Sequence, residues 1–181
     1  FDFNSVAKRK NPSGLVEAFR QAFPEPRDDV HLVIKTINHD RHPEDYSDLL
    51  EAIGDRPDVL LLEQYFSAAQ RDALVASCDC YVSLHRSEGF GLTIAEAMLL
   101  GKPVIATDYG GSRDFVDETT GFPVRYSRVP VGLGAEPYSP EEIWEDHGLG
   151  RAVELMRSRR EDRVSAALRA ARGRERILTN H

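Results

Sequence analysis

The chain has 181 residues, a length typical of one domain with a substantial core. Its 23 Lys and Arg residues against 30 Asp and Glu residues leave a net charge of −7, which argues against broad electrostatic binding to nucleic acid or to an anionic membrane. With 41% hydrophobic residues and no apolar run near the roughly 18 residues that a membrane span needs, we expect a globular, cytoplasmic domain.

Short apolar runs alternate with helical patterns along most of the chain. The first run is a strand end at Phe1 without signal-peptide character, which indicates a part excised from a longer protein. The later runs are nearly all apolar, as strands covered on both faces must be: Val30–Lys35, Val59–Glu63, Cys80–Leu84 and Pro103–Thr107. This order predicts an α/β fold with a Rossmann-like, doubly wound parallel sheet and helices on both faces.

The helices between the strands are marked by capping residues and stop signals. In chain order these signals are a cap and first-turn proline at Asn11 and Pro12, a helix at Pro43–Ile53 stopped by Gly54, a capping box of Ser67 and Gln70, a helix from Leu92 to a left-handed stop at Gly101, and a hydroxyl cap at Ser112. The regular core is expected to end near residue 125.

The rest of the chain has a different character. Tyr126–His147 is rich in Pro and Gly, lacks a clear period and exceeds an ordinary connection, so we expect an irregular loop that is either functional or mobile. Helical spacing returns over about residues 149–178, within Gly150–Arg157 and Glu161–Leu178. The arginines of the last helix are expected to form a solvated face or a surface for a missing partner domain.

Neither the cysteines nor the histidines predict a metal site. Cys78 and Cys80 lie two apart in an apolar stretch, a spacing that suits neither a disulfide framework nor a four-ligand zinc site, so we expect reduced core thiols. His39, Asp40 and His42 lie in a polar loop without a convincing further ligand.

Ligands of a doubly wound sheet bind beyond the carboxyl ends of its strands, where a glycine-bearing loop runs from His85 into the helix at Leu92. Gly89 and Gly91 allow a ligand close to the backbone, and the amides of the helix start favour a phosphate. A tight strand-to-helix turn is the alternative interpretation.

Two glutamates flank this glycine loop. Glu88 lies in the loop, whereas Glu96 lies about one turn inside a helix that is apolar nearly all round, so we expect it to be buried. A buried carboxylate needs a hydrogen-bonding partner, and either a ribose diol or a nearby arginine would serve.

A basic segment, Lys8-Arg9-Lys10, precedes the first helix and follows the first strand. A lysine here would reach a diphosphate at the carboxyl edge of the sheet and neutralise it as a leaving group. The alternative is a solvated basic turn.

The two glutamates separated by seven residues, in Glu88-Gly89-Phe90-Gly91-Leu92-Thr93-Ile94-Ala95-Glu96, resemble the signature of family-4 (group 1) retaining glycosyltransferases. The similarity extends to Gly101–Ala106, to Phe1–Ser5 with Arg9–Pro12, to Gly110-Gly111 and, more loosely, to Trp144. It implies that residues 1–181 are the C-terminal, nucleotide-sugar-binding domain of a two-domain GT-B enzyme whose N-terminal acceptor domain is absent. Such an enzyme transfers a sugar from a nucleotide-diphosphate donor to a glycan or lipid-linked acceptor, without a metal or other cofactor.

The resemblance also implies roles for individual residues. Glu88 would be the catalytic residue, facing the donor sugar near its anomeric carbon, and Glu96 would hold the ribose. Lys10 would contact the diphosphate, and Arg9 is a candidate for a second positive charge because Asn4 and Ser5 stand where many members carry an arginine. The remaining donor-binding positions provide backbone to the phosphate oxygens, namely Gly89, Phe90, Gly91, Leu92 and Thr93.

Two further functions fit the same residues: a nucleotide-sugar epimerase and a non-catalytic nucleotide-sugar-binding module. The donor base and sugar are not predicted, because the base pocket of such folds is formed largely by backbone, here near Lys35–Ile37 and Glu63–Tyr65. Without the acceptor domain we expect the chain to bind donor without turning it over.

Overall fold

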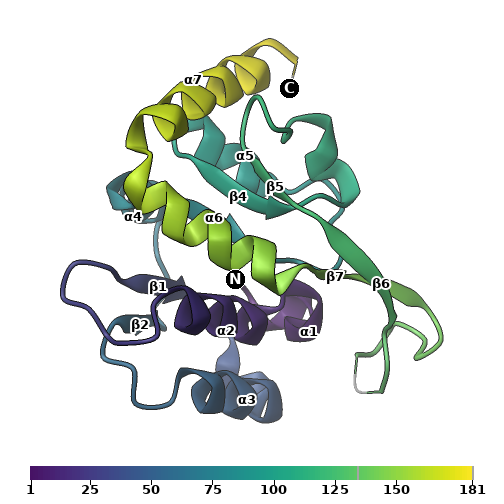
Figure 1. The fold of residues 1–181 in the computed structure, drawn as a ribbon. Helices are drawn as coiled ribbons and strands as arrows, with labels where there is room; N and C mark the ends of the chain where they lie inside the picture. Colours follow the sequence, from purple (N-terminus) through teal and green to yellow (C-terminus); the bar gives the residue numbers. More distant parts are fainter. Residues whose placement is uncertain (134, 181) are drawn as a thin grey trace.

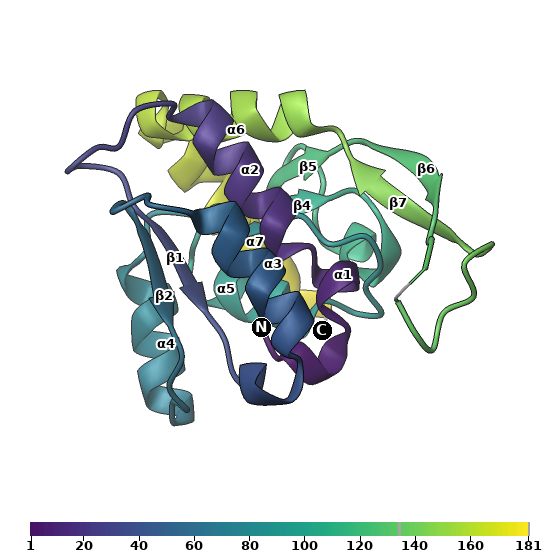
Figure 2. The ribbon, with the colours of Figure 1, turned by 90° about the horizontal axis from the view of Figure 1, so that it is seen from below.

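The structure, a computed structural model, describes residues 1–133 and 135–180, with the side chains of residues 145–147 and 160 outside that description. It is an α/β fold whose parallel strands are covered by helices on both faces, as predicted (Figures 1 and 2). Among the described residues, no helix combines the length and the apolar character needed to cross a bilayer.

The strands are hydrogen-bonded into two parallel sheets and one antiparallel hairpin. The first sheet pairs β1 with β2, the second has the order β3-β4-β5, and the hairpin pairs β6 with β7. Their bounds are Leu32–Lys35 for β1, Val59–Leu62 for β2, Tyr81–Ser83 for β3, Val104–Thr107 for β4, Phe122–Val124 for β5, Tyr126–Pro130 for β6 and Ile143–His147 for β7.

The expected first strand at Phe1 is reduced to a single parallel bridge between Asp2 and Ile37. Coverage on both faces holds fully for the central strand β4, which is buried at every position. It does not hold for β2, where Leu60 is 44% exposed, because β2 is an edge strand and the nearby helix α4 (Ala68–Ser77) contributes no buried residue. The expectation that an apolar run is covered on both faces therefore overestimated the burial of β2 at this edge of its sheet.

The other helices are α1 at Ala7–Lys10, α2 at Pro12–Ala22, α3 at Pro43–Ile53, α5 at Leu92–Leu99, α6 at Leu149–Glu161 and α7 at Arg163–Asn180, with short 3₁₀ turns at Phe3–Ser5, His39–Arg41 and Gly110–Asp114. The capping box of Ser67 with Gln70 is present, and Gly54 and Gly101 end their helices at positive φ, as the sequence predicts.

The two predicted caps have different outcomes. Asn11 is the N-cap residue of α2 and Pro12 its first residue, as predicted, although the Asn11 side chain donates from Nδ2 to the carbonyl of Leu84 at 3.0 Å and makes no capping hydrogen bond. The prediction that the hydroxyl of Ser112 caps the start of a helix is wrong. Ser112 lies inside the Gly110–Asp114 turn, where its hydroxyl donates to the carbonyl of Tyr109 at 3.1 Å. A tertiary contact thus uses the side chain of Asn11, whereas a contact within the same turn uses that of Ser112.

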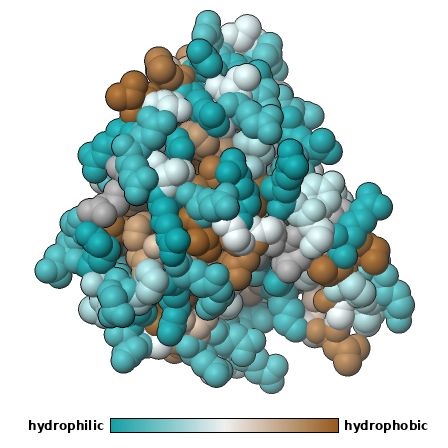
Figure 3. All heavy atoms as spheres, in the orientation of Figure 1, coloured by the Kyte–Doolittle hydropathy of each residue, from teal (hydrophilic) through white to brown (hydrophobic). Residues whose placement is uncertain are grey.

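The expected irregular loop at Tyr126–His147 is wrong at its two ends, which pair as β6 and β7 with Tyr126 opposite His147, whereas the described residues between these strands form turns and bends. The hairpin extends to one side of the sheets (Figure 1), and Trp144 is buried against the ring of Tyr138 at 5.2 Å between centroids. Apolar groups are visible on its surface (Figure 3), where Leu133 is 83% exposed. The pairing was missed because each strand has only five residues and the connection between them is rich in proline and glycine.

The two cysteines are free, in agreement with the absence of a predicted disulfide, but both remain partly exposed rather than fully inside the core. Cys80 packs against the main hydrophobic cluster, and burial raises the pKa of its thiol to about 12. Burial also raises the pKa of Cys78. Both thiols are therefore protonated at neutral pH.

Candidate functional site

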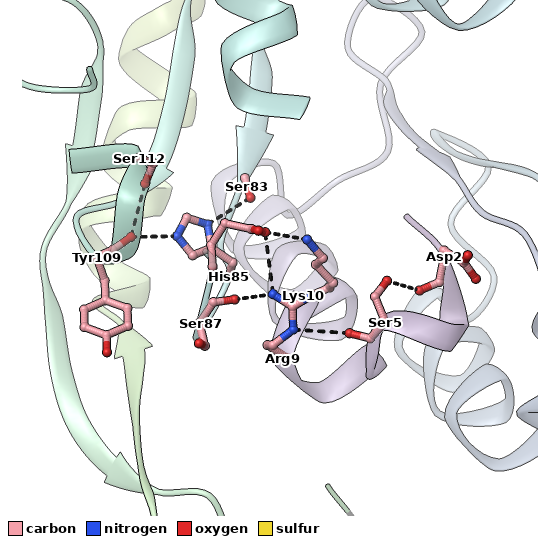
Figure 4. Close-up of polar contacts among 10 residues, drawn as sticks. Asp2, Ser5, Arg9, Lys10, Ser83, His85, Ser87, Tyr109 and Ser112 are labelled. Carbon is pink, nitrogen blue, oxygen red and sulfur yellow. Dashed lines mark hydrogen bonds and ion pairs between the residues drawn. The ribbon is translucent and has the colours of Figure 1, made fainter. Parts of the chain in front are cut away.

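The basic segment and the glutamate loop meet at the carboxyl ends of the strands (Figure 4). Lys10, at the end of α1, donates from Nζ to Oε2 of Glu88. Arg9 donates from Nη1 to the carbonyl of Ser87 at 2.7 Å, and the same nitrogen lies 3.7 Å from Oε2 of Glu88. The Lys10 and Arg9 side chains are only 23% and 15% exposed, so this segment is not the solvated basic turn considered above.

The backbone of α1 is fixed to the same loop. The amide of Arg86 donates to the carbonyl of Arg9 at 2.8 Å, and the Arg86 guanidinium donates to the carbonyl of Lys8 at 3.2 Å. With the bond from Asn11 to Leu84, these contacts join segments about 75 residues apart in sequence. The position of Lys10 relative to Glu88 is therefore set by backbone contacts as well as by their ion pair.

The charge state of Glu88 follows from its surroundings. Burial alone would raise the pKa of this carboxyl, but the hydrogen bond from Lys10 and the positive charges of Lys10 and Arg9 outweigh burial and lower its pKa. Glu88 is thus a carboxylate at neutral pH. It can stabilise developing positive charge or act as a nucleophile, but it cannot supply a proton.

The glycine loop leaves space for a ligand on one side. Gly91 has a φ of +90° and directly precedes α5, and a Cβ at the exposed Gly89 would have no neighbour within 4 Å. The amides of the first turn of an α-helix have no partner within the helix. At the start of α5 they belong to Leu92 and Thr93, both exposed residues, so an anion has access to this helix end.

On its other side, the glycine loop packs tightly against the segment that follows β4. The amide of Gly111 donates to the carbonyl of Gly89 at 2.8 Å. A Cβ at Gly110 would lie 2.2 Å from the carbonyl oxygen of Glu88, and one at Gly111 would lie 2.1 Å from that of Gly89. These glycines are needed because two backbones are in contact, a role that the sequence did not reveal.

The expectation that Glu96 is buried is wrong. Its side chain is 39% exposed, and its Oε1 lies 3.4 Å from Nη2 of Arg71 on α4. The apolar composition of α5 was misleading because Leu92 is 68% exposed and Leu99 is 38% exposed. The arginine partner considered for Glu96 is present at the surface, and the carboxylate remains accessible to a ligand hydroxyl.

The sequence also gave no indication of a buried imidazole at the base of the site. His85 is completely buried, with Nδ1 3.0 Å from Oγ of Ser83 and Nε2 3.1 Å from the carbonyl of Tyr109. Burial lowers the pKa of His85 despite the Tyr109 carbonyl and the charge of Glu88, so the ring is neutral. Since a carbonyl only accepts hydrogen bonds, Nε2 carries the proton and Nδ1 accepts from Ser83.

The segments expected beside a nucleobase, Lys35–Ile37 and Glu63–Tyr65, lie at the ends of β1 and β2. Polar side chains connect them: Tyr65 donates its hydroxyl to Oδ1 of Asn38, and Asn38 donates from Nδ2 to Oδ1 of Asp2 at 2.8 Å. Tyr65 is 72% exposed, so its ring has a face available to solvent.

Comparison with known proteins assigns the family. Residues 3–145 match the family model described as glycosyl transferases group 1. The chain belongs to this family. This group 1 glycosyltransferase chain is 37% identical over 106 residues to a trehalose synthase from Pyrococcus horikoshii, a match covering 55% of the chain and 25% of that protein. It is 29% identical over 149 residues to the human alpha-1,3/1,6-mannosyltransferase ALG2, covering 74% of the chain and 36% of that protein.

The fold of the group 1 chain is also that of solved glycosyltransferase structures. TarM from S. aureus superposes with a TM-score of 0.70 at 20% identity, over 95% of this chain and 30% of TarM. Alr3699/HepE from Anabaena, solved with UDP and glucose, superposes with a TM-score of 0.65 at 20% identity, over 93% of this chain and 40% of HepE. The C-terminal domain of LpcC from Francisella tularensis superposes with a TM-score of 0.67 at 20% identity, over 96% of this chain and 80% of the LpcC domain. The chain thus spans a quarter to about a third of the curated relatives named above.

Proposed function

We propose that this chain is the donor-binding domain of a retaining, metal-independent glycosyltransferase that moves a sugar from a nucleotide diphosphate to a glycan or lipid-linked acceptor. The observation that carries this proposal is the contact of Lys10 and Arg9 with Glu88 beside the open end of α5. Two cations and a carboxylate are therefore held next to the glycine loop that leads into α5. The relatives solved with UDP and UDP-glucose support the choice of ligand.

Each part of a donor has a chemical counterpart in this site. The diphosphate is placed at the start of α5, where the amides of Leu92 and Thr93 and the ammonium of Lys10 stabilise the negative charge that grows as the glycosidic bond breaks. These groups supply the positive charge that a metal supplies in other transferases. Arg9 takes the place of the arginine that many family members carry nearby, and its Nε is held by the carbonyl of Ser5 at 3.3 Å.

The two glutamates are given separate roles. The Glu88 carboxylate faces the anomeric carbon and stabilises an oxocarbenium-like state, either electrostatically or as a nucleophile. Glu96 accepts hydrogen bonds from the two ribose hydroxyls, since an exposed carboxylate has lone pairs for both. Binding of the donor also supplies Lys10 with a second anionic partner beside Glu88.

Isothermal titration calorimetry of the chain with UDP, GDP and ADP tests this function. We expect one of the three to bind, and Lys10→Ala to weaken its binding by at least about tenfold, because a charge-assisted contact is lost. Lys102→Ala is the matched control, because this substitution also removes one positive charge but at a position beyond the opposite end of α5. Absence of binding by all three nucleotides, or equal loss in both variants, would contradict the proposal.

We propose that the acceptor half of the reaction belongs to a region outside these 181 residues, which match only 25% and 36% of the length of the two curated relatives. The chain alone is therefore proposed to bind donor without transferring sugar. Transfer to a glycan acceptor by the 181-residue chain would show that this division of labour is wrong.

A further inference from the structure

The geometry of Glu88 depends on a loop from a different strand. The segment Tyr109–Gly111, which follows β4, packs backbone to backbone against Glu88 and Gly89. The contacting atoms are main-chain carbonyls and amides, and the rings of Phe90 and Phe115 add a contact with 5.3 Å between their centroids. A buried polar side chain provides a further link between the two loops.

His85 makes a further contact between the two loops (Figure 4). It stands three residues before Glu88, and its Nε2 donates to the carbonyl of Tyr109, the residue before the two glycines. The same carbonyl accepts from the hydroxyl of Ser112 at 3.1 Å. Ser83, on β3, donates to Nδ1 and so fixes the rotation of the ring. One side chain thus links the start of the Glu88 loop to the segment that packs against its end.

We propose that His85 is a positioning residue, which holds Tyr109–Gly111 against the Glu88 loop and thereby keeps the glycine loop in the geometry that receives the donor diphosphate. Its effect on ligand binding rests on the proposed function above. The ring itself is completely buried and acts through Tyr109. A histidine that only fills space in the core would stabilise the chain without this specific effect.

The hydrogen-bonding pattern selects the substitutions that separate these two roles. His85→Leu keeps apolar bulk and removes both hydrogen bonds. His85→Gln retains one donor for the Tyr109 carbonyl and one acceptor for the Ser83 hydroxyl. Thr120→Val is the matched control, because Thr120 is also buried and its hydroxyl also donates to a carbonyl, that of Phe115 at 2.8 Å. Thr120 differs from His85 in its location, since it precedes β5 at the opposite edge of the sheet.

Two measurements on the 181-residue chain test the proposal: hydrogen exchange of the Gly111 amide by NMR, and the affinity for UDP by calorimetry. In His85→Leu we expect the Gly111 amide to exchange at least about tenfold faster and the dissociation constant for UDP to rise at least about tenfold. Both effects follow because the buried Tyr109 carbonyl loses its partner. His85→Gln should restore both to within about threefold of wild type. Thr120→Val should lower the melting temperature without changing either quantity.

The proposal is overturned if His85→Leu leaves Gly111 protected, if Gln does not restore protection, or if Thr120→Val exposes Gly111 to the same extent. Should His85→Leu fail to fold, Ser83→Ala replaces it, since it releases the ring's second contact, and unchanged Gly111 exchange in Ser83→Ala also overturns the proposal. If wild type binds none of UDP, GDP and ADP, the proposed function fails, and Gly111 exchange alone decides whether His85 holds the loops together.

Discussion

Lys10 and Glu88 form an ion pair between two segments that approach each other only through the fold, one ending α1 and the other following β3. The pair is largely shielded from solvent, and Arg9 adds a second positive charge at 3.7 Å. A carboxylate that is half-buried between two cations keeps its charge at neutral pH, which is the state that the proposed function requires of Glu88.

The first prediction concerns the charge of Glu88 when its main partner is removed. In Lys10→Ala the pKa of Glu88 should rise, because burial still disfavours the charged form while the hydrogen bond and the nearest charge are gone. NMR titration of the Glu88 carboxyl carbon measures this directly. Lys102→Ala should leave the titration unchanged, and an unchanged pKa in Lys10→Ala would mean that Arg9 alone sets the charge of Glu88.

The second prediction concerns the contact between the two loops. Gly111→Ala should destabilise the chain by about 1 to 3 kcal/mol, the range for forcing extra atoms into packed structure, because its Cβ would meet a backbone carbonyl that cannot rotate away. Chemical denaturation measures the change. Gly150→Ala is the control: Gly150 lies in α6 with open space around it, so this substitution should be neutral or stabilise by up to about 1 kcal/mol.

The third prediction concerns pH and the attachment of α7. Asp117 accepts hydrogen bonds from Arg176 of α7 and from the amide and hydroxyl of Thr119. Burial disfavours the charged form of Asp117, but these contacts outweigh burial and hold the pKa of its carboxyl far below the usual 3.8. A depressed carboxyl pKa contributes stability that is complete above the unfolded value and is lost as pH falls toward the folded value. Asp117→Asn should therefore be less stable than wild type above about pH 4, by about 1 kcal/mol for a partly exposed group.

This difference should narrow progressively below pH 4, because wild-type Asp117 then takes up protons on unfolding and loses its advantage. Thermal melts of both proteins between pH 7 and pH 2.5 provide the measurement. Glu118→Gln is the neighbouring control. A difference that stays constant at low pH would show that the hydrogen bonds of Asp117, rather than its charge, stabilise the chain.

The fourth prediction concerns the hairpin. Trp144 is buried against Tyr138, whereas the other strand residues whose burial the structure describes, Tyr126–Pro130 and Ile143, are exposed or partly exposed. Trp144→Ala should therefore detach the hairpin locally, at a cost of about 3 kcal/mol or more to its pairing, while the parallel sheets remain folded. Limited proteolysis should cut the variant first within residues 131–142. Ile143→Ala, at a half-exposed position beside it, should not increase cleavage.

The fold was predictable from local pattern where each element carries its own signal. The capping box at Ser67, the glycine stop at Gly54 and the buried run of β4 all follow from residues a few positions apart. The antiparallel hairpin was not predictable in this way, because its pairing depends on contacts such as Trp144 with Tyr138 that no local period encodes.

The site divides along the same line. The location of Lys10 and Glu88 at the same edge of the sheet followed from the rule that ligands bind at the carboxyl ends of strands, whereas their ion pair was not predicted. The exposure of Glu96 did not follow from the sequence, because apolar residues on α5 predict a buried helix only if other elements cover them, and Leu92 and Leu99 remain exposed. His85 escaped notice because a single histidine in a loop has no pattern, and its partners Ser83 and Tyr109 are defined only by the fold.

The raised pKa values of Cys78 and Cys80 have a practical consequence for studying this site. Alkylating dyes react with thiolates, and two thiols that hold their protons at neutral pH react slowly. A cysteine introduced at Gly89, where a new side chain meets nothing within 4 Å, would be labelled well ahead of both. The native cysteines can then stay in place while a fluorophore beside the glycine loop reports the arrival of a ligand.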